Sequence, residues 1–326
     1  MPNYSDRPDQ AGELRRMVEN DINRTPPRLH TLSVLSGKGG VGKSNISAGL
    51  SFALADFGKR VVLIDADLGM ANLDILCGVT KAKWNISHLL DGSRSLSEIL
   101  VHFRVSGRAE RENGGVALLP GGVGLKEIAD MDDTELARLF ASLSVLDETA
   151  DYVIMDAGAG IHKGALSFAY ASEATLLVTT PEPTSIRDAY GVIKSLGAAA
   201  WSNTVSNNNA SGVLLVVNMA NSSREAAEVA ERIRLASTQF LGKAPSYLGY
   251  VLKDDVIGRS VKNRKIFYRT DPDSNAGICV RNLAGEVLRL FEGANIQREI
   301  LPEEARGMRG FLRRLTKSLF MEENKK

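Results

Sequence analysis

The chain has 326 residues, of which 44% are hydrophobic and 6% aromatic, and its 40 basic and 39 acidic residues leave a formal net charge of +1. A chain of this length can bury a substantial core, and about 260 residues suffice for one α/β domain with tails. The cysteines, Cys77 and Cys279, stand far apart, which excludes the paired spacing of disulfide, zinc and iron–sulfur proteins and favours a reducing cytosol. Because neither a signal peptide nor an apolar run of about 18 residues occurs, we expect a cytoplasmic protein.

Residues 1–28 are expected to form a separate N-terminal segment, because Pro26 and Pro27 interrupt the chain just before the first strand-like run. Apolar residues recur within this segment at helical spacing. They are Ala11, Leu14, Val18 and Ile22. A helix this short is marginal in water, so we expect disorder until a partner covers the apolar stripe; a helix packed on its own domain is the alternative.

A phosphate-binding loop follows the first strand-like run. Gly37, four further residues, Gly42, Lys43 and Ser44 spell G-x-x-x-x-G-K-S. Glycines let consecutive backbone N–H groups surround an anion, and the following helix adds its positive N-terminal end. We expect Lys43 to reach the β- and γ-phosphates of ATP and Ser44 to ligate Mg²⁺. The nucleotide-binding residues predicted in this loop are Gly37, Lys38, Gly39, Gly40, Val41, Gly42, Lys43, Ser44 and Asn45.

Strand-like and helix-period runs alternate from Thr31 onward. The strand-like runs are 31–35, 60–64, 116–119, 152–155, 175–179, 213–217 and 247–252. Several are apolar on both faces, as expected for strands of a parallel sheet that is covered on each side. We therefore predict a single α/β P-loop domain over residues 29–292, with a mostly parallel twisted sheet and helices on both faces.

Carboxylates follow two of the predicted strands, at the sheet edge where α/β proteins bind ligands. Asp65 and Asp67 come directly after one run and are spaced so that both can face a magnesium–phosphate site; a surface turn is the alternative. Asp156 ends the run at 152–155, and we expect it to face Mg²⁺ through a water molecule. The glycines after Asp156 would let the backbone approach the γ-phosphate and move when that group leaves.

Two further residues are predicted to contact the nucleoside. Asn218 ends a buried run, where its amide can hydrogen-bond both edges of adenine; a strand-end cap is the alternative. Asp254 follows the next run and is predicted to approach the ribose.

The C-terminal segment, residues 293–326, is predicted to be a basic amphipathic helix. Between Arg306 and Lys326 there are seven Lys and Arg against two Glu. On a helical wheel the bulky apolar residues fall on the face opposite the basic ones. The apolar set is Met308, Phe311, Leu312, Leu315 and Leu319. This composition is typical of a helix in an anionic membrane interface, so we predict membrane targeting; docking on the body or on a partner protein is the alternative.

The phosphate-binding loop contains a second lysine, Lys38, directly after its first glycine. With KGGVGKS the chain resembles the deviant Walker A ATPases, the MinD/ParA group. The resemblance implies that Lys38 contacts the phosphates bound by the other subunit of an ATP-dependent homodimer; a second local phosphate contact is the alternative. It also implies that Asp65 lies near the metal and that Asp67 orients the attacking water. Ala157 departs from the hydroxyl or proline that relatives often carry there, which concerns switch II hydrogen bonding and not the role of Asp156.

The chain further resembles the branch of MinD-like ATPases that regulates flagellar number. The stretches DQAGELR and PEPTSIRDAY and the basic tail carry this likeness. It implies that the N-terminal motif engages an FlhF-type GTPase at the cell pole and stimulates its hydrolysis. The motif residues are Asp9, Gln10, Ala11, Leu14 and Arg15. Flagellar basal-body (C-ring) proteins and a flagellar transcription activator are the other implied partners.

These features predict a slow ATPase switch on the inner face of the cell membrane. ATP and Mg²⁺ would pair two monomers and expose membrane and partner surfaces, and hydrolysis would separate them. A ParA-type partitioning ATPase would need a basic DNA-binding surface in its body, whereas here the basic excess is confined to the tail, so no nucleic acid is expected. A scaffold that holds ATP without hydrolysing it stays open as a second alternative.

Overall fold

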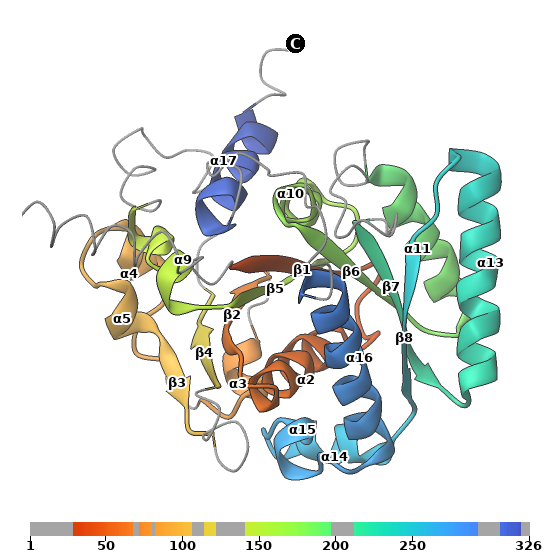
Figure 1. Ribbon diagram of the computed structural model, residues 1–326, viewed down its shortest axis with the longest axis horizontal. Helices are drawn as coiled ribbons and strands as arrows, with labels where there is room; N and C mark the ends of the chain where they lie inside the picture. Colours follow the sequence, from red (N-terminus) through yellow and green to blue (C-terminus); the bar gives the residue numbers. More distant parts are fainter. Residues whose placement is uncertain are drawn as a thin grey trace, which may run out of the picture.

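The computed structural model describes residues 29–67, 72–79, 82–105, 114–121, 141–196, 212–292 and 307–320. Within them an eight-stranded sheet crosses the molecule (Figure 1). The strands are β1 (His30–Ser36), β2 (Arg60–Ala66), β3 (Val101–Phe103), β4 (Gly115–Leu119), β5 (Tyr152–Ala159), β6 (Ala174–Thr179), β7 (Val213–Ala220) and β8 (Ser246–Leu252). Every run that the sequence predicted as a strand is one of these.

The sheet is parallel apart from one pair. Its strand order is β3-β4-β2-β5-β1-β6-β7-β8, and only β3 runs antiparallel to its neighbour, β4. The sequence analysis missed β3, because this strand has three residues and none of them is buried, so no hydrophobic periodicity marks it. Since the other strands are parallel, their carboxyl ends meet along one edge, which is where the predicted site residues lie.

Helices cover both faces of the sheet, as predicted (Figure 1). One layer holds α2 (Lys43–Asp56), α3 (Leu73–Leu76), α14 (Asp255–Lys262), α15 (Phe267–Thr270) and α16 (Asn275–Glu292). The other layer holds α4 (Ile86–Leu90), α5 (Leu96–Ile99), α9 (Leu146–Thr149), α10 (Lys163–Ala171), α11 (Pro183–Ser195), α13 (Ser223–Leu241) and α17 (Gly307–Phe320). The described chain is therefore a three-layer α/β structure of the predicted class.

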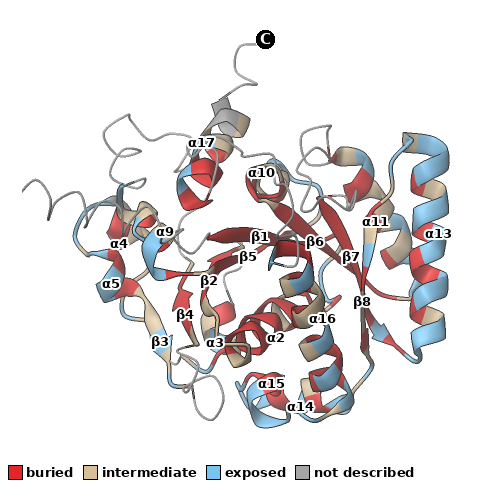
Figure 2. Ribbon diagram, in the orientation of Figure 1, coloured by how far each residue is buried: buried red, intermediate tan, exposed pale blue. Residues whose placement is uncertain are grey.

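Two hydrophobic cores lie between these layers, one on each face of the sheet. Successive residues of a strand point to opposite faces, so Val34 of β1 joins one core and Leu35 joins the other. The strands are buried almost throughout, whereas α13 buries one side and exposes the other (Figure 2). This difference explains why the strands appear in the sequence as continuous apolar runs.

The C-terminal helix α17 is docked on the body in this structure, which is the alternative that the sequence left open, and its membrane targeting stays a prediction. It packs against α10, α9 and β1, and Phe311 stacks on Phe168 with ring centroids 6.2 Å apart. Four residues of the predicted membrane face are fully or nearly fully buried there. They are Met308, Phe311, Leu312 and Leu315. The side chain of the fifth, Leu319, lies outside the described residues. The physical reason is that the body offers these side chains an apolar surface without any membrane.

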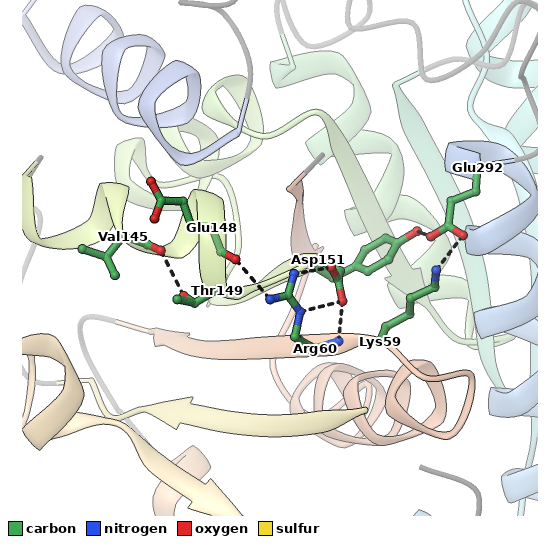
Figure 3. A network of polar contacts seen from close by, with 8 residues as sticks. Lys59, Arg60, Val145, Glu148, Thr149, Asp151 and Glu292 are labelled. Atoms are coloured by element: carbon green, nitrogen blue, oxygen red, sulfur yellow. Dashed lines mark hydrogen bonds and ion pairs between the residues drawn. The ribbon is translucent and has the colours of Figure 1, made fainter. Parts of the chain in front are cut away.

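Ion pairs tie the strands together at the edge opposite the phosphate-binding loop (Figure 3). Asp151 accepts hydrogen bonds from the backbone N–H of Arg60 at 2.8 Å and from its Nη2 at 2.7 Å. Lys59 donates to Glu292 at the end of α16, and so does the hydroxyl of Tyr152. These contacts join the starts of β2 and β5 to the last residue of α16.

We expect Asp151→Ala to lower the free energy of unfolding by about 1–3 kcal/mol at pH 7, because it removes hydrogen bonds between charged groups. Burial acts to raise the pKa of Asp151, but the hydrogen bonds from Arg60 outweigh it and hold the pKa below its ordinary value. A carboxyl of this kind stabilises the fold above its unfolded pKa near 4, and the effect is lost as pH falls through the folded pKa. Urea denaturation should therefore show the difference between wild type and variant shrinking below about pH 4.

The matched control is Glu231→Ala, which breaks an exposed ion pair with Arg234 on α13. It should leave the free energy of unfolding nearly unchanged, because an exposed ion pair is screened by solvent. A pH-independent difference for Asp151→Ala would contradict the assignment of the effect to the ionised carboxylate.

Candidate nucleotide-binding site

The phosphate-binding loop joins β1 to α2 and takes a conformation that depends on its glycines. Gly40 and Gly42 have φ values of 81° and 86°, in the left-handed region where a side chain is strained. A Cβ atom on Gly37 would lie 2.3 Å from the carbonyl carbon of Asp188, so this glycine allows α11 to pack against the loop. The N-terminus of α2 follows at once and supplies unpaired backbone N–H groups.

Lys43, Asp156 and Ser47 form a buried polar cluster beneath the loop. Lys43 Nζ donates to Asp156 Oδ1 at 2.8 Å, and the exposed fractions of the two side chains are 8% and 2%. The hydroxyl of Ser47 donates to the same carboxylate oxygen at 2.8 Å. Burying these charges is tolerable only because each has a partner. A bound phosphate could take over Lys43, which would free Asp156 to face a metal ion.

Asp65 is the register partner of Asp156 on the neighbouring strand. It accepts hydrogen bonds from the backbone N–H groups of Leu73 at 3.0 Å and Asp67 at 3.2 Å. Burial, together with the nearby charge of Asp156, raises the pKa of Asp65 to about 6 despite these hydrogen bonds. Two carboxylates thus lie at adjacent strand ends while Lys43 pairs with Asp156, and a divalent ion would stabilise the charge of both.

Asp67 lies beside the strand that carries Asp156. A Cβ atom on Gly158 would be 3.3 Å from Asp67 Oδ1 and 2.8 Å from Nε2 of His162. The absence of a side chain at Gly158 therefore lets the segments that carry Asp67 and Asp156 approach each other. His162 accepts the backbone N–H of Ala165 through Nδ1 and so caps α10.

Lys38 contacts the start of α11 in this structure. Its Nζ donates to Glu182 Oε2 at 2.5 Å and to the hydroxyl of Thr184 at 3.0 Å. The exposed fraction of the Lys38 side chain is 31%, and that of the Glu182 side chain is 65%. The contact is therefore a solvent-screened ion pair, which costs little to break.

Asn218 connects the end of β7 to the phosphate-binding loop. Its Nδ2 donates to the backbone carbonyl of Val41 at 2.8 Å. Its Oδ1 is buried and has no hydrogen-bond partner among the described residues. An unpaired buried acceptor is costly, and the exocyclic amine of adenine is a donor that would satisfy it. The predicted contact with adenine stays a prediction.

The carboxylate of Asp254 has a structural role, because it binds the backbone at the starts of two helices. Its two carboxylate oxygens accept the backbone N–H groups of Val256 at 3.0 Å and Ala276 at 3.2 Å, which caps α14 and fixes the start of α16. Its predicted approach to the ribose stays a prediction.

The remaining predicted residues are in or beyond the same region. Ser44 and Asn45 lie half-buried in the first turn of α2, and Gly39 and Gly40 are exposed. The partner motif, Asp9, Gln10, Ala11, Leu14 and Arg15, lies outside the described residues. Across the described ranges, no group of three or more His, Cys, Asp and Glu could hold a metal ion by itself. The predicted Mg²⁺ ligands, Ser44, Asp65 and Asp156, stay a prediction; hydroxyl and carboxylate oxygens together with phosphate oxygens are a donor set typical of this ion.

The sequence analysis missed three polar residues of this site. Ser47 lies one helical turn beyond Lys43, and only the fold shows that its hydroxyl meets Asp156. Glu182 and Thr184 belong to the PEPTSIRDAY stretch, but their contact with Lys38 spans more than 140 residues. Local sequence patterns carry no signal for such pairs.

Comparisons with known proteins agree with this geometry. Residues 32–266 match the model of the CobQ/CobB/MinD/ParA nucleotide-binding domain. The chain is 32% identical to the antiactivator FleN of Pseudomonas aeruginosa, over 79% of this chain and 86% of that protein. It is also 32% identical to the flagellum site-determining protein YlxH of Helicobacter pylori, over 88% of this chain and 90% of that one.

A solved structure of the septum site-determining protein MinD from Pyrococcus horikoshii, complexed with Mg-ADP, has the same fold. It superposes with a TM-score of 0.60 at 26% sequence identity and covers 82% of this chain and 100% of that one.

We expect Asp65→Asn to stabilise the nucleotide-free protein at pH 7.5 by about 1–2 kcal/mol. The folded pKa of Asp65 is about 6, above its ordinary value, so ionising this carboxyl at higher pH destabilises the fold. The variant removes that charge, and its advantage should fade as pH falls from 7 towards 4. Urea denaturation across this range measures the effect.

The same variant should weaken binding of Mg-ADP, because it removes a negative charge beside the proposed metal position. A variant that is less stable than wild type at pH 7.5, or equally stable at every pH, would contradict this account of Asp65.

Proposed function

This chain belongs to the CobQ/CobB/MinD/ParA family of nucleotide-binding proteins, and from that premise we propose that it is an ATP-driven switch that regulates flagellar number or placement. The observation that carries the proposal is the second loop lysine, Lys38, held by a weak contact while Lys43 occupies the buried position. A protein that only binds a nucleotide needs only Lys43. The Lys38 ammonium group can give up its contact with Glu182 at little cost, so it is suited to bind the phosphates of a second subunit.

We assign each role in the proposed hydrolysis to a residue of this site. ATP would supply the γ-phosphoryl group that water attacks, and Mg²⁺ would screen the negative charge of the phosphates. Lys43 would neutralise the phosphates, while Ser44 and Asp156 would hold the metal. Asp67 would orient the attacking water, with Asp65 supporting the metal side. Hydrolysis in this arrangement is expected to be slow, as suits a switch.

Pairing of two subunits would use Lys38 in a second position. In the free protein Glu182 and Thr184 hold its ammonium group. In the ATP-bound homodimer we propose that Lys38 turns to the phosphates of the partner subunit. Exchanging an exposed ion pair for a buried contact with phosphate favours the dimer only while the terminal phosphate is present.

The flagellar role rests on the relatives that cover most of the chain, an antiactivator and a flagellum site-determining protein. We propose that the N-terminal motif stimulates an FlhF-type GTPase. Basal-body (C-ring) proteins or a flagellar transcription activator would be further partners. The protein would act at the inner face of the membrane, near the cell pole.

Membrane association would require α17 to leave its docking site, because its apolar face is buried. No helix in the described ranges has the length and hydropathy needed to cross a bilayer. The docked state is held in part by Asp147 of α9, whose Oδ1 accepts the backbone N–H of Met308 at 2.6 Å. We propose that the paired protein releases two such helices, whose combined binding exceeds that of one.

Lys38→Ala should abolish ATP-dependent dimerisation and hydrolysis while leaving ATP affinity within about threefold of wild type, because Lys43 still binds the phosphates. Size-exclusion chromatography with ADP and with a non-hydrolysable ATP analogue, followed by a phosphate-release assay, measures this. Lys59→Ala is the control, since it removes a lysine of similar exposure that pairs with Glu292 at the opposite edge. A mutant that still dimerises and hydrolyses ATP normally would refute the role of Lys38 between subunits.

Asp147→Ala should increase the binding of the nucleotide-free protein to phosphatidylglycerol vesicles by roughly fivefold, because a lost helix cap costs about 1 kcal/mol of docking. Vesicle co-sedimentation measures the change. Glu148→Ala, at the exposed neighbouring position on α9, should have no effect. Equal vesicle binding by Asp147→Ala and wild type, with or without ATP, would argue against α17 as the membrane anchor.

A further inference from the structure

A polar cavity lies far from the phosphate-binding loop, at the C-terminal end of α2. It has a volume of about 510 Å³ and opens between α2, α15, the start of α16 and the chain that follows β3. Its lining includes three arginines and one carboxylate. These are Arg104, Arg269, Arg281 and Asp56. Aromatic rings of Phe52, Phe57 and Tyr268 form much of the remaining wall.

Arg269 is held in place by neutral groups. Its guanidinium lies over the ring of Phe52, with 5.1 Å between the guanidinium carbon and the ring centroid, and 5.8 Å from that of Phe103. Its Nη2 donates to the backbone carbonyl of Arg104 at 3.0 Å. Among the described residues, no carboxylate pairs with the side chain of Arg269 or Arg104. The positive charge of Arg269 is therefore positioned but not neutralised.

Arg281 is fixed by a chain of hydrogen bonds. Its Nε donates to the hydroxyl of Tyr268 at 3.2 Å, and that hydroxyl donates to Asp56 at 3.0 Å. Burial raises the pKa of Tyr268 to about 12, so the phenol keeps its proton at neutral pH. Asp273 also approaches Arg281, at 3.6 Å, but its side chain is 88% exposed and the pair is weak.

The charges of the lining leave an excess of two positive charges. Asp56 already accepts one hydrogen bond from Tyr268, which uses part of its capacity. Two preorganised guanidinium groups present planar donor forks that match the oxygens of phosphate and lose little rotamer entropy on binding. A phosphate dianion neutralises two positive charges, whereas a single carboxylate neutralises one.

This cavity is separate from the proposed nucleotide site. Lys43 begins α2 and Asp56 ends it 13 residues later, so the two sites stand about 20 Å apart along one helix. A cavity of this volume also exceeds what a lone ion needs and falls within the range of small-molecule sites. The aromatic rings offer an apolar surface for the remainder of such a ligand.

We propose that this cavity is a second anion site, which binds a phosphate group carried by a small organic molecule or by a lipid headgroup. The phosphate would lie between Arg269 and Arg281, with Arg104 completing the positive rim. Phe57 and Tyr268 would pack against the group that carries it.

The test uses the full-length protein with its phosphate-binding loop saturated by Mg-ADP, so that a further event reports the second cavity. Isothermal titration with inorganic pyrophosphate should then show saturable binding, while a fluorescent ADP analogue stays bound at the loop. Arg269→Gln and Arg281→Gln should each weaken this binding at least tenfold. Arg289→Gln, which removes an exposed arginine of α16 paired with Glu286, should leave it unchanged.

Asp56→Asn supplies a test with the opposite sign. It keeps an acceptor for Tyr268 but removes the carboxylate of the lining, so pyrophosphate binding should tighten about threefold. This variant also keeps the proposal testable if an arginine variant fails to fold, which thermal unfolding would reveal.

A second experiment separates the two sources of phosphate. Vesicles that contain phosphatidic acid should retain the ADP-loaded wild type more than Arg269→Gln if the ligand is a lipid headgroup, and equally if it is a soluble molecule. The proposal is overturned if the ADP-loaded protein binds neither pyrophosphate nor vesicles through this cavity, or if Arg269→Gln behaves like Arg289→Gln in both assays. Neither result bears on hydrolysis at the phosphate-binding loop, which the Lys38 experiment addresses.

Discussion

The buried ion pair between Lys43 and Asp156 is the interaction around which the nucleotide site is arranged. Two charges without water are tolerable only at close range and with further hydrogen bonds, here from Ser47. Meeting that demand requires β1 to lie beside β5, and α2 to start where β5 places its carboxylate. The parallel arrangement of β1 and β5 therefore brings Lys43 and Asp156 together in addition to packing the core. A phosphate can enter because Lys43 and Asp156 can each exchange their mutual contact for a ligand of opposite charge.

Much of the fold could be predicted because its signals are local. Runs such as VVLI and YVIM, and the glycines and lysines of the loop, indicate strand, turn and helix within a few residues of each other. What could not be predicted depends on partners distant in sequence. Examples are the contact of Lys38 with Glu182 and the docking of α17 against Phe168. Amphipathicity predicted α17 correctly as a helix, but an apolar face does not specify which apolar surface will cover it.

Two elements of the structure are held by contacts that other interactions could replace. The exposed ion pair of Lys38 is weak, and α17 is kept by apolar packing together with one carboxylate at its first turn. Asp65, by contrast, carries a burial cost that raises its pKa to about 6. Residues that lower stability in the free protein are common where a ligand is expected, because binding then relieves the cost. Strain in the nucleotide site and replaceable contacts around it are together what a reversible switch requires.

The buried face of α17 has a consequence for how such a protein can diverge. Met308, Phe311, Leu312 and Leu315 complete the interior of the docked form. If the same four side chains also insert into lipid, any substitution among them changes both the stability of the docked form and the affinity of the helix for the bilayer. Selection could then adjust one property alone only on the solvent side of the helix, where Arg309 and Arg313 are exposed. Related proteins that differ in adhesion should accordingly differ most at those arginines and keep the apolar stripe.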